Sequence, residues 1–290
     1  MDINKWFSEN TYPIKDKTIA ITGATGGLGR EICKHLAYLG ADLIFVDRNR
    51  EKSEKFGNEL TAEFPNISIT YITADMEDIE SVKEASDKLN NSNIDIFIAN
   101  AGAYRIPRKK CSTGFDNIFQ INYMSPYYII TKILPVLKSR KGKIIAVGSI
   151  AHKFTRINKN DIELLNCKNA EKVYGNAKRI LMFSLYELFK NEREASLSIV
   201  HPGITYTNLM ANYPKWLSVI IKYPMKIIFM SPKEASLSVI KGIFYKCNSY
   251  EWIGPRAFGI WGKPKVSKLK KADDKELLIL KKYLYKEETI

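Results

Sequence analysis

Tyr174 and Lys178 stand four residues apart, and Ser149 precedes Tyr174 by 25 positions. Residues four apart on a helix are surface neighbours, so we expect the lysine ammonium to act on the tyrosine phenol. A tyrosine with its ordinary pKa of about 10 is a weak acid–base catalyst at neutral pH. A nearby cation favours the phenolate and lowers that pKa. The pair therefore predicts a proton donor or acceptor suited to interconverting a carbonyl and an alcohol, within reach of a serine hydroxyl.

A glycine-rich run between Thr22 and Gly29 indicates a second kind of chemistry. It follows an apolar, β-rich segment and precedes an amphipathic one. In that position glycines let the backbone approach a pyrophosphate at a helix N-terminus, so the run predicts a dinucleotide-binding turn. Because Gly26 and Gly27 are adjacent, the run fits the spacings of both short dehydrogenases and sugar-nucleotide epimerases, and it leaves both open.

Asp47 and Arg48 lie at the end of the second expected strand, about where a dinucleotide-binding fold contacts the adenosine ribose. An aspartate there accepts hydrogen bonds from the two ribose hydroxyls of NAD and repels the 2′-phosphate of NADP. An arginine attracts that phosphate, although a solvated strand-end charge is an equally good interpretation of Arg48. No Lys or Arg lies between Thr22 and Gly29. The sequence therefore favours NAD over NADP.

Alternating apolar and amphipathic segments predict how these residues are positioned. The pattern is that of a parallel sheet covered by helices on both faces, so we expect one doubly wound (Rossmann) α/β domain over residues 1–290. The expected strands are 18–22, 41–46, 67–74, 94–99, 143–147 and 197–200, with an edge strand near Trp252–Ile253. The expected helices are a segment ending near Leu39, then 50–63, 79–89, 115–137 and 173–190, and a tail helix over 268–286.

Small and polar residues follow the third and fourth expected strands. Asp75 is placed to hold an adenine amino group, and Asn100, Ala101 and Gly102 are small enough to let the backbone lie beside a cofactor. Each is also compatible with an ordinary turn. Their joint placement at carboxyl ends of parallel strands favours a dinucleotide site.

Composition bounds the remaining possibilities. A length of 290 residues with 45% hydrophobic content suits one soluble globular domain. The four cysteines form no CxxC pair, which is typical of reduced thiols in a cytoplasmic protein and indicates neither a disulfide frame nor a metal site. The chain start lacks a signal-peptide core, and the apolar stretch 216–230 is too short and too charged to span a bilayer. The net charge of +14 comes without a nucleic-acid motif, so an anionic dinucleotide is preferred over nucleic acid as the partner.

Together these residues make the chain resemble the short-chain dehydrogenase/reductase family over nearly its whole length. The matching elements are Thr22–Gly29, Asp75, Asn100–Gly102, Asn122, Ser149, Tyr174 with Lys178, and Pro202-Gly203. A narrower likeness, to the retinol dehydrogenase-like branch, is carried by Ser149–His152, His201–Asn208 and 253–264. Two departures weaken the branch assignment more than the activity. Ala99 stands where a second asparagine is usual, and Ala177 stands where a serine is common.

The resemblance implies a role for each catalytic residue. Tyr174 is the general acid in reduction and the general base in oxidation, and Lys178 lowers its pKa and hydrogen-bonds the nicotinamide ribose. Ser149 orients the substrate oxygen, and Asn122 helps to hold a water that links Lys178 to solvent. His152 matches a position outside this set, as does His201, and both are interpreted as structural. The residues expected to contact the cofactor are Thr22, Gly23, Thr25, Gly26, Gly27, Leu28, Gly29, Asp47, Arg48, Asp75, Met76, Asn100, Ala101, Gly102, Tyr174, Lys178, Pro202, Gly203, Ile204, Thr205 and Thr207.

The segment Thr205–Met230 is expected to cover the substrate, and its apolar side chains favour a lipophilic alcohol or carbonyl compound. Its interleaved lysines also allow peripheral contact with an anionic membrane surface. By resemblance we expect a homo-oligomer, a dimer or tetramer. Two other functions stay open: a dinucleotide-binding sensor or scaffold without turnover, and a sugar-nucleotide epimerase. The first typically lacks the Tyr/Lys pair. The second is disfavoured by the Ser–Tyr layout and by the absence of a long C-terminal substrate domain.

Overall fold

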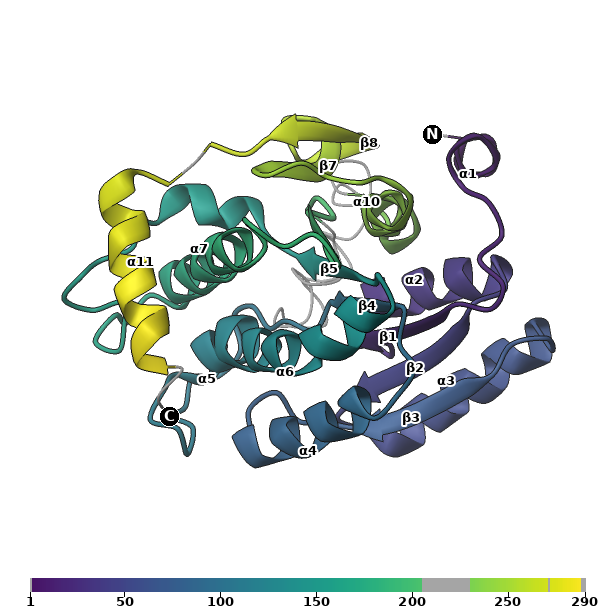
Figure 1. The fold of residues 1–290 in the computed structure, drawn as a ribbon, viewed down its shortest axis with the longest axis horizontal. Coiled ribbons are helices and arrows are strands. Elements are labelled where there is room, and N and C mark those ends of the chain that lie inside the picture. Colours follow the sequence, from purple (N-terminus) through teal and green to yellow (C-terminus); the bar gives the residue numbers. More distant parts are fainter. Residues whose placement is uncertain (1, 205–229, 271, 288–290) are drawn as a thin grey trace, which may run out of the picture.

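A largely parallel sheet forms the centre of the computed structural model, which describes residues 2–204, 230–270 and 272–287 (Figure 1). The strand order is β3-β2-β1-β4-β5-β6-β7-β8, and only the β7–β8 pair is antiparallel. The strands are β1 (Thr18–Thr22), β2 (Asp42–Asp47), β3 (Ile69–Thr73), β4 (Ile96–Ala99), β5 (Lys143–Val147), β6 (Ser196–Val200), β7 (Glu251–Ala257) and β8 (Trp261–Lys268). The order reverses between β1 and β4, and ligands of open α/β sheets bind at such a switch point.

Helices cover both faces of the sheet (Figure 1). They are α1 (Ile3–Asn10), α2 (Gly27–Tyr38), α3 (Arg50–Glu63), α4 (Ile79–Asn90), α5 (Asn117–Phe119), α6 (Ser125–Ser139), α7 (Ala170–Leu188), α10 (Pro232–Phe244) and α11 (Asp274–Glu287). One apolar layer joins α1, α2, α3 and α10 to the sheet, and the other joins α4, α6, α7 and α11. The central strand β4 is buried at every position, as a strand covered on both faces must be. The predicted doubly wound fold is confirmed.

A π-helix, Gln120–Met124, interrupts the single long helix expected over 115–137. It separates α5 from α6, and Pro126 lies in the first turn of α6. A proline at this position has no N–H to lose and suits a helix start. Single-turn π-helices are rare and are found frequently at functional sites.

The tail differs from the expected helix over 268–286. Lys268 instead closes β8 and pairs with Glu251 of β7, so this end of the prediction is wrong. The helix begins at Asp274, and just before it the Asp273 carboxylate accepts a hydrogen bond from the Glu276 N–H at 2.8 Å. A carboxylate in this position satisfies a free N–H of the first turn, which explains the later start. Strand β8 and helices α1 and α10 were not predicted.

Of the expected substrate-covering segment Thr205–Met230, the structure describes only Met230, and Ile204 is the last described residue before the segment. Met230 is buried, and its N–H donates to the Ile204 carbonyl at 3.1 Å. Among the residues that the structure describes, none of the helices is long and apolar enough to cross a membrane.

Candidate active site

Ser149 and Tyr174 lie close together between the end of β5 and the second turn of α7. Ser149 precedes the short 3-10 helix Ile150–Phe154, and its hydroxyl accepts the Ala151 N–H at 3.2 Å. Tyr174 is partly buried, and the Ser149 side chain lies near enough to its hydroxyl to lower its pKa. A Cβ on Gly175 would lie only 2.8 Å from the Ala151 carbonyl oxygen. The absence of a side chain at 175 therefore lets α7 approach the 3-10 helix closely enough for the two hydroxyls to meet.

Lys178 lies one turn further along α7, with 3% of its surface exposed. Its Nζ donates to the Val147 carbonyl at 2.9 Å and lies 6.0 Å from the centre of the Tyr174 ring. Burial lowers the pKa of Lys178 to about 8, because a buried ammonium loses its hydration.

The expected lowering of the Tyr174 pKa is not what the structure shows. Burial raises the pKa of Tyr174, and the neighbouring Ser149 side chain opposes this increase only in part. Tyr104 contributes a further increase, with its ring edge-on to Tyr174 at 5.0 Å between centroids. Desolvation of the phenolate therefore outweighs the cation that the sequence emphasised.

Asn122 lies in the π-helix and faces Lys178 across Gly102. Its Nδ2 donates to the Ala103 and Ile118 carbonyls, both at 2.8 Å. Its Oδ1 is buried and has no hydrogen-bond partner among the described residues. A Cβ on Gly102 would lie 2.9 Å from that Oδ1 and 3.5 Å from Lys178 Nζ. A glycine is therefore needed here, and the orphaned acceptor indicates room for a polar group between Asn122 and Lys178.

The glycine-rich turn is fixed by hydrogen bonds to the end of β4. Thr22 Oγ1 accepts the N–H groups of Asn100 and Ala101 at 3.0 and 2.9 Å. The Asn100 side-chain amide donates to the carbonyls of Thr22 and Gly23. Gly23 has a φ of 72°, and a Cβ on Gly29 would lie 2.0 Å from the Gly23 carbonyl oxygen. Gly26 precedes α2 and Gly27 begins it, so N–H groups of this helix start face the turn.

Asp47 is 6% exposed at the end of β2. Its carboxylate accepts hydrogen bonds from Thr25 Oγ1 at 3.1 Å and from Ser53 Oγ at 3.2 Å. Burial raises the pKa of Asp47, and the two hydroxyl bonds oppose this increase. The Arg48 side chain is 70% exposed, and its Nη1 lies 3.9 Å from Asp75 Oδ2. Asp47, Arg48 and Asp75 thus lie at neighbouring strand ends, as expected.

Three other expected cofactor contacts lie within the described residues. Met76 is buried in the apolar layer under α4 and α6, and its carbonyl accepts the Ser125 hydroxyl at 2.7 Å. Leu28 is partly buried against the opposite layer. Pro202 follows β6 and is partly buried. The structure gives these side chains packing positions near the site, and their contacts to a cofactor stay predictions.

Gly203 and Ile204 follow β6 and contact the tip of the β7–β8 hairpin. Gly203 has a φ of 85°, and a Cβ there would lie 2.7 Å from the Ile260 carbonyl oxygen. The Ile204 N–H donates to the same carbonyl at 3.4 Å. Thr205 and Thr207, expected at the nicotinamide end, lie outside the described residues.

The two histidines beside the site pack against Trp252. His152 meets the indole edge-on at 5.4 Å, and His201 stacks on it at 5.5 Å. Burial lowers the pKa of each imidazole to about 4, so both are neutral at physiological pH. This fits the structural role inferred for them from the sequence.

Two features of the site were not predicted from the sequence: the position of Tyr104, and the contact that holds α7 against α11. For Tyr104, the available signal was its place two residues after Gly102, which was itself expected at the cofactor.

The contact between α7 and α11 had no such signal. Arg179 follows Lys178 and donates to the carboxylate of Glu276 at 3.1 and 2.5 Å. Glu276 also accepts the Ile157 N–H, and Arg179 also donates to the His152 carbonyl. The pair therefore fixes the segment after Ser149 against α7, and no local signal connects residues 97 positions apart.

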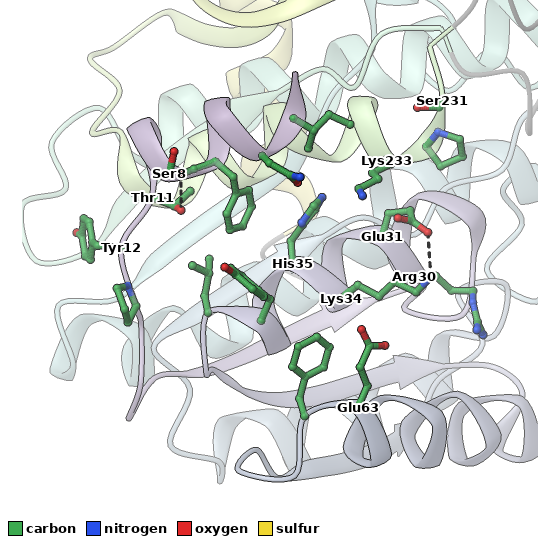
Figure 2. A pocket seen from close by; sticks show the side chains of 18 of the residues that line it. Ser8, Thr11, Tyr12, Arg30, Glu31, Lys34, His35, Glu63, Ser231 and Lys233 are labelled. Carbon is green, nitrogen blue, oxygen red and sulfur yellow. Dashed lines mark hydrogen bonds and ion pairs between the residues drawn. The ribbon is translucent and has the colours of Figure 1, made fainter. Parts of the chain in front are cut away.

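Other features of the described residues do not compete with this site. No group of three or more His, Cys, Asp or Glu side chains among them is arranged to hold a metal. A cavity of about 1390 Å³ lies between α1, α2 and the start of α10. Figure 2 shows His35 and Lys233 in it, with Ser8 and Thr11 on α1 and the loop that follows it. Its lining contains none of the four catalytic candidates, so it is not the place where the catalytic groups converge.

The comparisons agree with this fold. A family model described as short chain dehydrogenase matches residues 17–160. Human polyprenol dehydrogenase is 24% identical over 81% of this chain and 74% of its own. Human retinol dehydrogenase 13 is 28% identical over 68% of this chain and 61% of its own. The crystal structure of an uncharacterised protein from Mycobacterium paratuberculosis has a TM-score of 0.75 and 20% identity, covering 97% of each chain.

One class of protein combines a Rossmann sheet, a glycine-rich turn and a Ser–Tyr–Lys arrangement: the oxidoreductases that use a nicotinamide dinucleotide. This chain belongs to the short-chain dehydrogenase/reductase family, and its relatives lie in the retinol dehydrogenase-like branch. The chain spans between about three fifths and three quarters of the length of these relatives.

Proposed function

We propose that this protein interconverts an alcohol and a carbonyl group on an apolar substrate, with a nicotinamide dinucleotide as cofactor. The observation that carries the proposal is the proximity of the Ser149 side chain to the Tyr174 hydroxyl, beside a buried Lys178 that faces Asn122. We also propose that residues 1–290 act as one domain, and the homo-oligomer stays a prediction.

The residues present suit the cofactor. Gly26 and Gly27 are exposed at the start of α2, where a pyrophosphate meets N–H groups, and Gly29 lets the helix pack closely against Gly23. Gly102 leaves space beside Lys178 that any side chain would fill, and the unpaired Asn122 Oδ1 is ready to accept a hydrogen bond. We assign the pyrophosphate to the turn Thr22–Gly29 and the nicotinamide ribose to Tyr174 and Lys178. When bound, the dinucleotide supplies or accepts the hydride.

Tyr174 moves the proton at its hydroxyl oxygen. It donates to the carbonyl oxygen in reduction and accepts from the alcohol in oxidation. Ser149 donates to the same oxygen and stabilises the negative charge that develops there. A positive charge on Lys178 favours the phenolate of Tyr174, which forms when the tyrosine donates its proton in reduction and which accepts the proton in oxidation. Asn122, held by two carbonyls, positions the polar group that connects Lys178 to solvent.

The substrate class rests on the relatives' names and on apolar residues near the site. The relatives include dehydrogenases of polyprenol and retinol, both lipophilic alcohols. The ring of Tyr104 packs on Tyr174, and Ile150 follows Ser149 directly. We propose a lipid-like primary or secondary alcohol, or the matching aldehyde or ketone, as the substrate.

We propose NAD as the preferred cofactor, with Arg48 limiting the preference. Thr25 and Ser53 fix the Asp47 carboxylate, which retains capacity to accept from ribose hydroxyls. The same negative charge opposes a 2′-phosphate, while the exposed Arg48 attracts one. The two residues therefore act in opposite directions.

Two other functions would give different results in the binding and turnover experiments described below. A cofactor-binding sensor without turnover would bind the dinucleotide but convert no substrate. A sugar-nucleotide epimerase would convert UDP-sugars without net change in cofactor absorbance.

The proposed function is tested in two stages. Fluorescence titration with NADH and NADPH should show saturable binding, with NADH bound more tightly. Oxidation of a panel of retinoid, polyprenol and medium-chain alcohols should then produce NADH, measured by its absorbance. Absence of dinucleotide binding contradicts the proposal. Binding with no conversion across the panel and its matching carbonyl compounds favours the sensor.

A further inference from the structure

The β7–β8 hairpin is strongly basic on its exposed face. From Trp252 to Ala272 the chain contains no Asp or Glu. Arg256, Lys263, Lys265 and Lys268 are exposed in the two strands, and they form no ion pair with a described residue. Lys263 and Lys265 alternate with the buried Pro264, so both point away from the molecule. Lys263 and Lys265 therefore give this face a local positive charge that no residue described by the structure neutralises.

The tip of this hairpin presents aromatic side chains to solvent. Phe258 is 83% exposed and Trp261 is 45% exposed, with 6.3 Å between their ring centroids. Phe154, in the adjacent 3-10 helix, is 80% exposed. Its neighbour Lys153 places an ammonium 5.5 Å over the ring of Trp252, which ties the 3-10 helix to the same hairpin. Isolated exposed aromatics are ordinary, but a basic face with several of them at its tip is not.

The aromatic tip lies close to the segment that carries Ser149. A Cβ on Gly259 would lie 3.3 Å from Ile150 Cδ1, next to Ser149. The Ile260 carbonyl accepts the Ile204 N–H where the chain leaves β6. An apolar molecule that reaches this tip is therefore beside the segment that carries Ser149.

We propose that the β7–β8 hairpin, with Phe154, is a docking surface for an anionic phospholipid bilayer. Aromatic rings of this kind insert at the boundary between headgroups and acyl chains, and lysines bind anionic headgroups while their stems cover apolar surface. Proximity to a site for an apolar substrate favours lipid over nucleic acid as the partner. The use of the surface for substrate entry rests on the proposed function, whereas binding to the bilayer does not.

Vesicle co-sedimentation tests the surface directly, without substrate or turnover. The purified full chain should sediment with phosphatidylcholine vesicles that contain phosphatidylserine, and much less with phosphatidylcholine alone. Lys263→Gln with Lys265→Gln should weaken binding about 30-fold, because each lysine near an anionic surface contributes about fivefold. Phe258→Ser with Trp261→Ser should abolish sedimentation at moderate salt, where the electrostatic part is screened.

Matched controls separate this surface from the net charge of +14. Lys52→Gln with Lys55→Gln removes two exposed lysines from α3, which lies by β2 and β3 at the opposite edge of the sheet. Tyr12→Ser with Tyr38→Ser removes two exposed aromatics beside α1 and α2. Both controls should bind vesicles as the wild type does, and all four variants should keep the wild-type Tm.

Any one of three results would overturn the proposal. The first is that the wild type does not bind phosphatidylserine vesicles at low salt, and the second is that the hairpin variants bind them as tightly as the controls do. The third is that single-stranded nucleic acid binds the same residues more tightly and displaces the protein from the vesicles. None of these results affects the cofactor titration, so failure here is distinguishable from failure of the proposed function.

Discussion

At the glycine-rich turn the inward-facing polar groups have partners: Thr22 receives two N–H groups, the Asn100 amide reaches two carbonyls, and Asp47 is held by two hydroxyls. Around Tyr174 the situation is reversed. Within the part of the chain that the structure describes, the Asn122 Oδ1 has no hydrogen-bond partner, and the buried Lys178 ammonium has a single carbonyl partner. The cofactor end is thus preorganised by satisfied hydrogen bonds, while the catalytic end keeps ionisable groups in unfavourable surroundings. Perturbed ionisable groups of this kind are characteristic of sites that transfer protons.

The largest expected effect on stability concerns the ion pair between Arg179 and Glu276, which joins α7 to α11 beside the catalytic residues. Glu276→Ala removes the partner of Arg179 and leaves a guanidinium that is 12% exposed without its counter-ion. We expect the free energy of unfolding to fall by about 3–5 kcal/mol, the usual cost of breaking a buried pair on one side. Urea denaturation measures it. Lys281→Ala is the control, because its pair with Glu187 is 47% exposed on the lysine side and should cost under about 1 kcal/mol.

Lys178 should make the catalytic end sensitive to pH in a defined direction. Its pKa falls from 10.5 to about 8 on folding, so the unfolded chain binds more protons between these values. The penalty for burying the charge is complete below pH 8 and disappears as the pH rises towards 10.5. Lys178→Met should therefore be more stable than the wild type by about 3 kcal/mol at pH 7, with the difference shrinking at higher pH. Denaturation of both proteins from pH 7 to 10 checks this, and a constant difference contradicts it.

The glycine-rich turn Thr22–Gly29 should respond to shape rather than to charge. Gly29→Ala places a Cβ where backbone already lies, so we expect about 1–3 kcal/mol of destabilisation and at least a tenfold loss of NADH affinity. At Gly26 a Cβ would lie 3.4 Å from the nearest atom, an ordinary contact. Gly26→Ala should therefore bind NADH several times better than Gly29→Ala does, by fluorescence titration. Equal losses at the two glycines would mean that close packing does not shape this turn.

The smallest effect concerns the choice of cofactor. Arg48→Ala should weaken NADPH binding about tenfold and leave NADH binding nearly unchanged, because only a 2′-phosphate needs the charge. Asp47→Ser should shift the preference in the opposite direction. Isothermal titration with both cofactors resolves these shifts. A loss of NADH affinity in the Arg48 variant would show that the arginine serves another part of the dinucleotide.

Much of the fold followed from the sequence because its parallel strands are near-continuous apolar runs. The helix Arg50–Glu63 matched the expected residues fully, and β1 and β5 matched as well. The proximity of Ser149 and Tyr174 was also predicted from the sequence. Ser149 follows the end of a strand, and Tyr174 lies near the start of the helix that packs beside that strand. These features depend on local pattern and on the right-handed connections of parallel sheets.

Other features depend on contacts between distant segments, which a local pattern does not encode. The π-helix at Asn122 comes from how that segment packs, and no propensity distinguishes it from an ordinary helix turn. Strand β8 reads as a lysine-rich tail, because its pairing with β7 is visible only in the fold. The pKa of Tyr174 was predicted in the wrong direction because the sequence shows the nearby lysine but not the extent of burial.

The most direct test of the account is Tyr174→Phe, with turnover and NADH affinity measured on the same preparation. The substitution removes the hydroxyl but keeps the ring that packs on Tyr104. We predict a fall in kcat of about 10²- to 10⁴-fold, the usual contribution of a positioned acid or base. The Kd for NADH should stay within about twofold, because the turn Thr22–Gly29 dominates binding. Turnover equal to that of the wild type would contradict the central role given to Tyr174.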